Sequence, residues 1–172
     1  MNKFIPAAML TFVFGATPFA PWASALAAPD ATYSVKLLTP ETALVAAQAA
    51  LAHCRKAGHQ VAVAVVDRAG VLQVLLRDRF AGAHTPDVAT RKAWTAASFR
   101  IATTDLAAET QAGKSMSGIR SAAGVMAIGG GRVIEAGGSS FGGIGISGAP
   151  GGEADDACAN AGIKAIAEAI EF

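Results

Sequence analysis

Helical spacing of apolar residues first occurs between Thr39 and Gly58. Thr39 can cap a helix that has Pro40 in its first position, and Gly58 can take the left-handed conformation that ends it. Small or apolar residues recur three and four positions apart and predict the buried face of this helix: Leu44, Ala47, Leu51 and Cys54.

Two runs rich in Val and Leu follow, at residues 60–67 and 71–77. Gly70 lies between them and can take the positive φ angle of a short hairpin loop. The two runs therefore predict a pair of antiparallel strands. The first run is almost continuously apolar, which indicates a strand covered on both faces.

Residues 86–99 predict a helix that Pro86 and Asp87 open. Its buried face consists of small side chains, which allow close packing: Ala89, Ala93, Ala96 and Ala97. A second short helix is predicted to follow, with three candidates for its N-cap: Thr103, Thr104 and Asp105. Residues 113–122 are expected to form a loop.

The last third of the chain carries most of the glycine. Three short strands are predicted there, "GVMAI", "RVIEA" and "FGGIGISG", separated by glycine turns. A final helix is expected after residue 151, with Glu153, Asp155 and Asp156 in its first turns. Its buried face recurs every four residues: Cys158, Gly162, Ile166 and Ile170.

The predicted order is helix, two strands, two helices, three strands, helix. This order indicates an α+β domain with an antiparallel sheet. No internal repeat or low-complexity linker interrupts it, so residues 29–172 are expected to form a single domain.

Residues 1–28 have the pattern of a cleaved secretory signal. Lys3 precedes an apolar run, and Ala25-Leu26-Ala27 is the expected recognition triplet before the cleavage site. A membrane anchor is the alternative, but prolines and a glycine break the run that would have to span a bilayer. The sequence thus predicts a periplasmic or secreted protein without a membrane span in its mature chain.

Charge and cysteine content narrow the classes of partner. The 14 Lys and Arg residues exceed the 13 Asp and Glu residues by one, and Lys3 falls in the expected signal, so the mature chain is formally neutral. Neutrality argues against nucleic acid as a partner, and the lack of a polybasic run argues against an anionic membrane surface. In an exported chain Cys54 and Cys158 are expected to form a disulfide, although two buried free cysteines are the alternative.

Several classes of catalytic and metal site lack the residues they need. No serine lies in a G-x-S-x-G elbow, and "GISGAP" departs from that pattern at its second glycine. His53, Cys54 and His59 cluster at one helix end but lack a fourth zinc ligand, and the two histidines are expected to face water. The glycine-rich stretch 142–152 leads into an acidic helix start without a P-loop lysine, so tight turns explain it better than phosphate binding.

The most chemically suggestive group surrounds His84. Arg77 and Arg79 precede it, and Arg91 and Lys92 follow on a predicted helix. A histidine in such a setting can ligate a haem iron, while Arg and Lys side chains can hold the propionates. The alternative is that His84 caps the helix or forms an ordinary hydrogen bond.

Three motifs resemble the HbpS/GlcG-like haem-binding family, which is related to the C-terminal domain of PduO-type proteins. They are V-x-D-x-x-G within "VAVAVVDRAGVLQVLLRD", K-A-x-T-A within "ATRKAWTAASF", and G-x-x-G-I-S-G within "FGGIGISGAPGGEADD". The resemblance runs from about Thr39 to the C-terminus. It implies a five-stranded antiparallel sheet with helices on both faces, assembly into homo-oligomers and haem as the cofactor.

The resemblance also bears on residues and roles. The K-A-x-T-A motif places Lys92 and Thr95 among the expected cofactor-binding residues with Arg77 and Arg91, and His84 matches the histidine that ligates haem in some relatives. The sequence therefore predicts an exported haem-binding protein for haem capture, buffering or sensing. Two alternatives remain: an enzyme acting on haem or a small organic acid in the same pocket, and an oligomeric accessory module for an envelope sensor or dehydrogenase.

Overall fold

The computed structural model describes residues 31–171. The expected signal sequence and its cleavage site lie outside these residues. Residues 31–34 contain no helix or strand, and from Val35 onward the chain forms one compact unit. Within residues 31–171, no helix combines the length and the apolar composition needed to cross a lipid bilayer.

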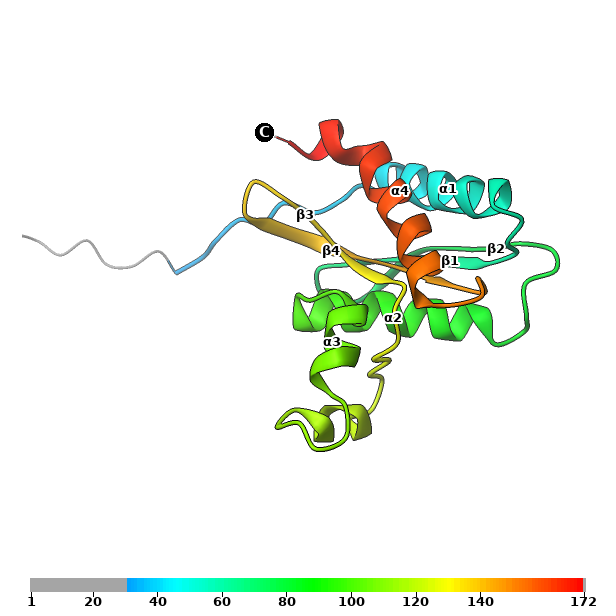
Figure 1. The fold of residues 1–172 in the computed structure, drawn as a ribbon. Coiled ribbons are helices and arrows are strands. Elements are labelled where there is room, and N and C mark those ends of the chain that lie inside the picture. The colour runs from blue at the N-terminus through cyan, green and yellow to red at the C-terminus, as the bar shows by residue number, and fades with distance from the viewer. Residues whose placement is uncertain (1–30, 172) are drawn as a thin grey trace, which may run out of the picture. The chain divides into compact units, whose positions relative to one another are not determined.

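Four helices and four strands make up the described part of the chain (Figure 1). The helices are α1 (Pro40–Lys56), α2 (Thr85–Phe99), α3 (Thr103–Glu109) and α4 (Gly152–Ile170), with a short 3₁₀ helix η1 (Ser117–Ser121). The strands are β1 (Ala62–Asp67), β2 (Leu72–Arg77), β3 (Gly131–Ala136) and β4 (Ser139–Ser147). They form one antiparallel sheet in the order β2-β1-β4-β3.

The α+β class and the antiparallel sheet are confirmed, but the expected fifth strand is wrong. Residues 124–128 form no strand. The backbone N–H of Met126 donates instead to the hydroxyl of Thr95 at 2.9 Å, and Val125 and Ala127 pack against Leu106 of α3. The segment is therefore held by a helix side chain and a small apolar cluster, and the order is α-β-β-α-α-β-β-α apart from η1.

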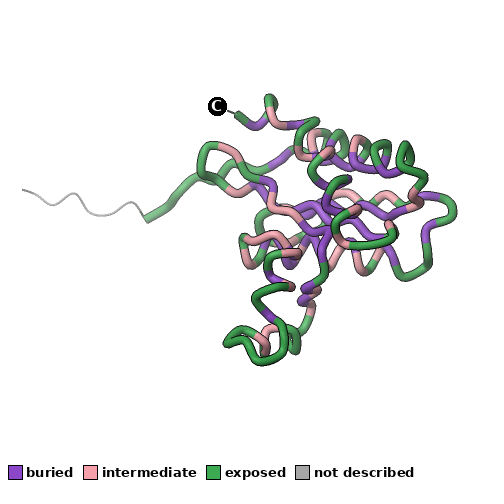
Figure 2. Tube along the Cα trace, in the orientation of Figure 1, coloured by how far each residue is buried: buried purple, intermediate pink, exposed green. Residues whose placement is uncertain are grey.

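Helices cover both faces of the sheet. Figure 1 shows α1 and α4 over one face and α2 across the other. The central strands β1 and β4 are buried on both sides, whereas the outward faces of the helices are exposed (Figure 2). The larger apolar core lies between the sheet and α1 with α4, and a thinner layer of mostly alanine lies between the sheet and α2.

The thin layer exists because glycine on β4 lets α2 come very close. A Cβ atom at Gly145 would lie 2.6 Å from the backbone nitrogen of Ala93, with the carbonyl oxygen of Ala89 closer still. Ala89, Ala93 and Ala97 are buried against this strand and against β1. The predicted alanine face of this helix is confirmed, and the strand that receives it needs glycine for the same contact.

A disulfide between Cys54 and Cys158 joins α1 to α4, with the two Cα atoms 5.5 Å apart. The predicted pairing is confirmed, and both cysteines are fully buried. Gly162 of α4 meets α1 at Ala46, where an added Cβ would lie 2.7 Å from the Ala46 carbonyl oxygen. The buried face of α1 therefore consists mostly of small residues, with Leu51 as the large one, and Leu44, expected in the buried stripe, is 38% exposed.

Most of the helix caps and turns predicted from the sequence are present in the structure. The Thr39 side chain accepts a hydrogen bond from the N–H of Thr42 at 3.2 Å, and Gly58 and Gly70 both have φ near 81°. The expected N-caps of the second short helix are wrong, because α3 begins after Ala102 without a capping side chain. Its threonines bond to other segments instead, as described below.

Candidate ligand-binding pocket

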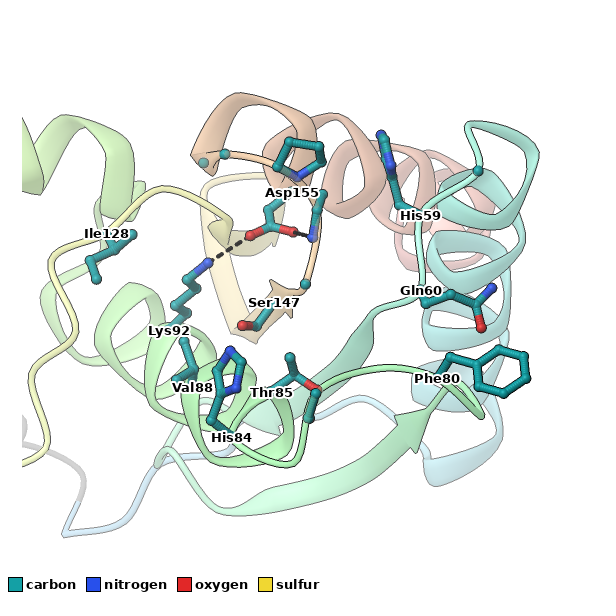
Figure 3. A pocket seen from close by; sticks show the side chains of 17 residues that line it. His59, Gln60, Phe80, His84, Thr85, Val88, Lys92, Ile128, Ser147 and Asp155 are labelled. Carbon is teal, nitrogen blue, oxygen red and sulfur yellow. Dashed lines mark hydrogen bonds and ion pairs between the residues drawn. The ribbon is translucent and has the colours of Figure 1, made fainter.

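A pocket of about 650 Å³ opens where β4 ends and where α2 and α4 begin (Figure 3). This volume lies within the range of small-molecule sites in proteins. The pocket is lined by the segment after α1, the loop before α2, one face of α2, and the turn between β4 and α4. The side chains with the clearest chemical roles are His59, Gln60, Phe80, His84, Val88, Lys92, Ile128, Ser147 and Asp155.

One face of α2 carries three pocket residues in line. His84, Val88 and Lys92 are spaced four residues apart, so they lie on consecutive turns of the same helix face. Along this face an imidazole comes first, an apolar side chain second and an ammonium group third.

His84 occupies the N-cap position of α2, but its side chain makes no capping hydrogen bond. No other hydrogen bond joins its imidazole to a described residue. A Cβ atom at Gly82 would lie 2.7 Å from the imidazole Cε1, so the glycine leaves room for the ring. The imidazole is thus placed at the pocket wall, and neither of its nitrogens bonds to the part of the chain that the structure describes.

Lys92 and Asp155 form a buried ion pair at the closed end of the pocket. The Lys92 Nζ lies 2.8 Å from Asp155 Oδ2 and donates to the carbonyl oxygen of Ile146 at 2.9 Å. The other oxygen of Asp155 accepts from the N–H of Ala149 at 3.1 Å. Burial raises the pKa of the Asp155 carboxyl, and the hydrogen bond from Lys92 opposes this shift.

A second acidic residue fixes the start of α4 to its neighbours. Asp156 accepts hydrogen bonds from the N–H of Gly130, at 3.0 Å, and from the hydroxyl of Thr104 on α3. Beside it, the Thr103 hydroxyl accepts from the N–H of Gly131 at 2.8 Å. Of the three carboxylates expected in the first turns, two therefore face inward, and the exposed one is Glu153.

Like His84, two further polar side chains of the pocket have groups without a partner among the described residues. The Ser147 side chain makes no hydrogen bond there, although the residue is only 5% exposed. Figure 3 shows its hydroxyl turned toward Lys92 and His84. Gln60, after α1, holds its side-chain oxygen buried without a hydrogen bond.

The remaining predicted site residues lie outside the pocket lining. Arg77 donates a hydrogen bond to the carbonyl oxygen of Ala81. Arg91 reaches the carbonyl oxygen of Gly124 at 3.4 Å. Thr95 is fully buried and serves the 124–128 segment. The structure therefore brings His84 and Lys92 together at one pocket and separates the other three from it.

Phe80 stands at the pocket mouth and is 79% exposed. Its loop is nevertheless firmly held, because Asp78 is buried and accepts two hydrogen bonds from Arg55, at 2.7 and 3.0 Å. The hydrogen bond from Arg55 lowers the pKa of the Asp78 carboxyl. The aromatic ring is thus presented to the opening by a fixed loop.

Two of these pocket residues escaped sequence reasoning. Asp155 was expected only in the first turns of its own helix, and its partner Lys92 lies 63 positions earlier. Ser147 carried one signal, its place as the polar residue of the G-I-S-G motif. His59, expected to face water, lies at the pocket wall and is half-buried. Across residues 31–171 no group of three or more His, Cys, Asp or Glu side chains is arranged to hold a metal ion.

Comparison with known proteins gives a consistent picture. The family model described as "Haem degrading protein HbpS-like" matches residues 38–164. A double mutant of HbpS from Streptomyces reticuli is 37% identical, with a TM-score of 0.74, and the match covers 84% of this chain and 97% of that chain. The structure of a PduOC:Heme complex is 31% identical, with a TM-score of 0.72, and covers 76% of this chain and 96% of its own.

A more distant match shows the fold alone. ORFY from Klebsiella pneumoniae is 24% identical, with a TM-score of 0.77, and the match covers 80% of this chain and 96% of that chain. No curated protein sequence matches the chain.

Proposed function

The chain belongs to the HbpS-like family, and on that premise we propose that it binds haem in the pocket beside α2, where His84 would hold the iron. The observation that carries this proposal is the His84 imidazole, which lines the pocket and makes no hydrogen bond within the described residues. A neutral imidazole with a free ring nitrogen is the form of histidine that ligates haem iron.

The surroundings of His84 fit a porphyrin. Gly82 leaves room for the imidazole ring, and Val88 and Ile128 form an apolar part of the pocket wall. The exposed ring of Phe80 lies at the mouth, where it can contact a flat apolar ligand. When bound, haem supplies redox chemistry at its iron, and these residues hold it, orient it and exclude water from one side.

Haem capture, buffering or sensing in the periplasm or outside the cell is the role we infer for this binding. The disulfide between Cys54 and Cys158 supports export, because such bonds persist in oxidising compartments. The neutral charge expected of the mature chain favours a small-molecule ligand over nucleic acid. Assembly into a homo-oligomer and contact with an envelope sensor or dehydrogenase remain predictions.

Haem turnover is the second candidate function, and the description of the matching family as haem degrading favours it. The same pocket would serve both functions. They differ in whether the haem spectrum persists or is lost when a reductant is supplied under air.

Titration of the purified protein with hemin tests the proposal. We expect a saturable Soret band at micromolar hemin, and we expect its position to change in His84→Ala. His53→Ala is the matched control, because His53 is an exposed histidine at the end of α1. Absence of a saturable Soret shift in the wild-type protein would refute haem binding, and an unchanged spectrum in His84→Ala would refute the ligand.

Addition of ascorbate to the haem complex separates the two functions. Binding alone predicts a stable Soret band, whereas turnover predicts loss of the band together with release of iron to a chelator.

A further inference from the structure

The closed end of the pocket, where Lys92 and Asp155 are paired, holds hydrogen-bond donors that no residue from 31 to 171 uses. Ser147 is 5% exposed as a residue, and its hydroxyl bonds to no described residue, so the hydroxyl is left to face the pocket. An ammonium group has three N–H donors, and Lys92 uses two of them, toward Asp155 and Ile146. Both side chains line the pocket, so a ligand can reach the unused donors.

The start of α4 adds backbone donors at the same place. Gly151 and Gly152 line the pocket, and Gly151, as the N-cap residue, has no side chain to satisfy the first N–H groups of the helix. These groups carry the positive end of the dipole of a helix of 19 residues. The unpartnered Ser147 hydroxyl points to a ligand independently of the helix.

From these groups we infer that the closed end of the pocket is a carboxylate subsite, in which Ser147, Lys92 and the first N–H groups of α4 receive an acid group of the ligand. This inference rests on the proposed function where the acid group is a haem propionate. A free small organic acid presents the same chemistry and would occupy the same subsite without haem.

The arrangement along α2 matches a ligand in which an acid group lies some distance from a metal centre. Eight residues separate His84 from Lys92, a rise of about 12 Å along the helix. Val88 lies between them and offers an apolar surface to the body of the ligand. Arg77 and Arg91, expected from the sequence to hold the propionates, lie outside the pocket lining and have no part in this subsite.

The charge of the subsite is balanced by Asp155, which faces the same ammonium group at 2.8 Å. A ligand carboxylate therefore meets a cation that is already paired, and it depends on the hydroxyl and the helix start for its additional stabilisation. Burial raises the pKa of Asp155, so this carboxyl takes up a proton more readily than an exposed aspartate would. With Lys92 and Asp155 paired, a ligand carboxylate adds one net negative charge, which the hydroxyl and the helix start stabilise.

Replacing the acid on the ligand and the hydroxyl on the protein tests the subsite. Hemin and hemin dimethyl ester, in which both propionates are esterified, are titrated into the wild-type protein and Ser147→Ala. We expect the esterified ligand to bind the wild type at least about tenfold more weakly than hemin, as loss of hydrogen bonds to a charged group predicts. Ser147→Ala should lower the affinity for hemin by about tenfold and leave the affinity for the ester almost unchanged.

Ser139→Ala is the matched control, because Ser139 is the exposed serine at the other end of β4. Ser147 has no hydrogen-bond partner to lose, so Ser147→Ala should unfold at the wild-type temperature, and a thermal scan checks this. If both proteins bind hemin and its ester equally well, the subsite is refuted while haem binding stands.

Sodium acetate distinguishes a free acid from a propionate and does not depend on haem. We expect acetate, but not equal sodium chloride, to shift the backbone amide resonances of residues 147–152, and Ser147→Ala to reduce these shifts. If the wild type binds no hemin, the proposed function fails, and the acetate titration alone decides the subsite. Absence of acetate-specific shifts in that case would overturn it.

Discussion

Replacement of Gly145 by alanine should destabilise the protein, because this glycine sets the distance between β4 and α2. An added Cβ would lie 2.6 Å from the backbone nitrogen of Ala93, well inside the 3.4 Å at which ordinary contact begins. The obstructing atoms belong to helix backbone and cannot rotate away. Either α2 must retreat by roughly 1 Å or β4 must bend.

The size of the effect follows from the layer that would separate. A gap of roughly 0.5–1 Å forfeits a quarter to a half of the attraction between packed atoms. The layer consists of six buried residues: Ala62, Ala64, Val66, Ala89, Ala93 and Ala97. Overpacking of a core typically lowers the free energy of unfolding by about 1–3 kcal/mol. Because the contact is with backbone, we expect Gly145→Ala to cost about 3 kcal/mol. For a domain of this size that corresponds to a fall in Tm of roughly 6–12 °C.

Thermal and urea unfolding followed by circular dichroism measure this change. Gly118→Ala is the matched control, because an added Cβ there meets nothing within 4 Å and the residue has no positive φ. Since His84 and Lys92 lie on α2, the same substitution should also weaken hemin binding. If Gly145→Ala and Gly118→Ala unfold within 1 °C of each other, on the order of experimental error, the close contact is not a determinant of stability.

Three further predictions concern the disulfide, the ion pair between Arg55 and Asp78, and a buried hydroxyl. Cys54→Ala opens a bond that spans 104 positions and should cost about 2–5 kcal/mol in urea unfolding; equal stability of the non-reduced wild type and the variant would contradict this. The hydrogen bond from Arg55 lowers the pKa of Asp78 below 3.8, so its stabilisation is present above that pH and is lost as the pH falls through the lower value in the folded protein. Asp78→Asn should therefore lose less stability than the wild type as the pH falls. If the stability of both proteins falls equally with pH in acid unfolding, the prediction is wrong. Thr95→Val leaves the N–H of Met126 without its acceptor, at a cost of about 1–3 kcal/mol, and hydrogen exchange of that amide should accelerate.

Features with local causes could be predicted from the sequence. Thr39 and Gly58 mark the ends of α1 because capping depends on a few neighbouring residues. The β1–β2 hairpin follows from two apolar runs and Gly70, whose φ is indeed positive. The alanine face of α2 was visible from its spacing alone.

Features that depend on distant segments could not be predicted. Residues 124–128 have strand-like composition, but their N–H at Met126 is taken by Thr95, 31 positions earlier. Leu44 has the correct helical spacing, yet α1 meets the glycine of α4 through Ala46 and Ala50, and Leu44 is left 38% exposed. The pairing of Lys92 with Asp155 joins α2 to α4, and neither residue carries a local sign of the other.

The disulfide between the first and last helices also bears on how the protein would respond to proteases. Residues 111–123 are almost entirely exposed and include Lys114 and Arg120, both possible tryptic sites. This segment lies inside the loop that Cys54 and Cys158 close. A single cut there would leave two fragments covalently joined, each supplying two adjacent strands of the sheet. The nicked molecule should migrate as one species without reductant and as two with it, and it offers a route to exchange either half by reassembly.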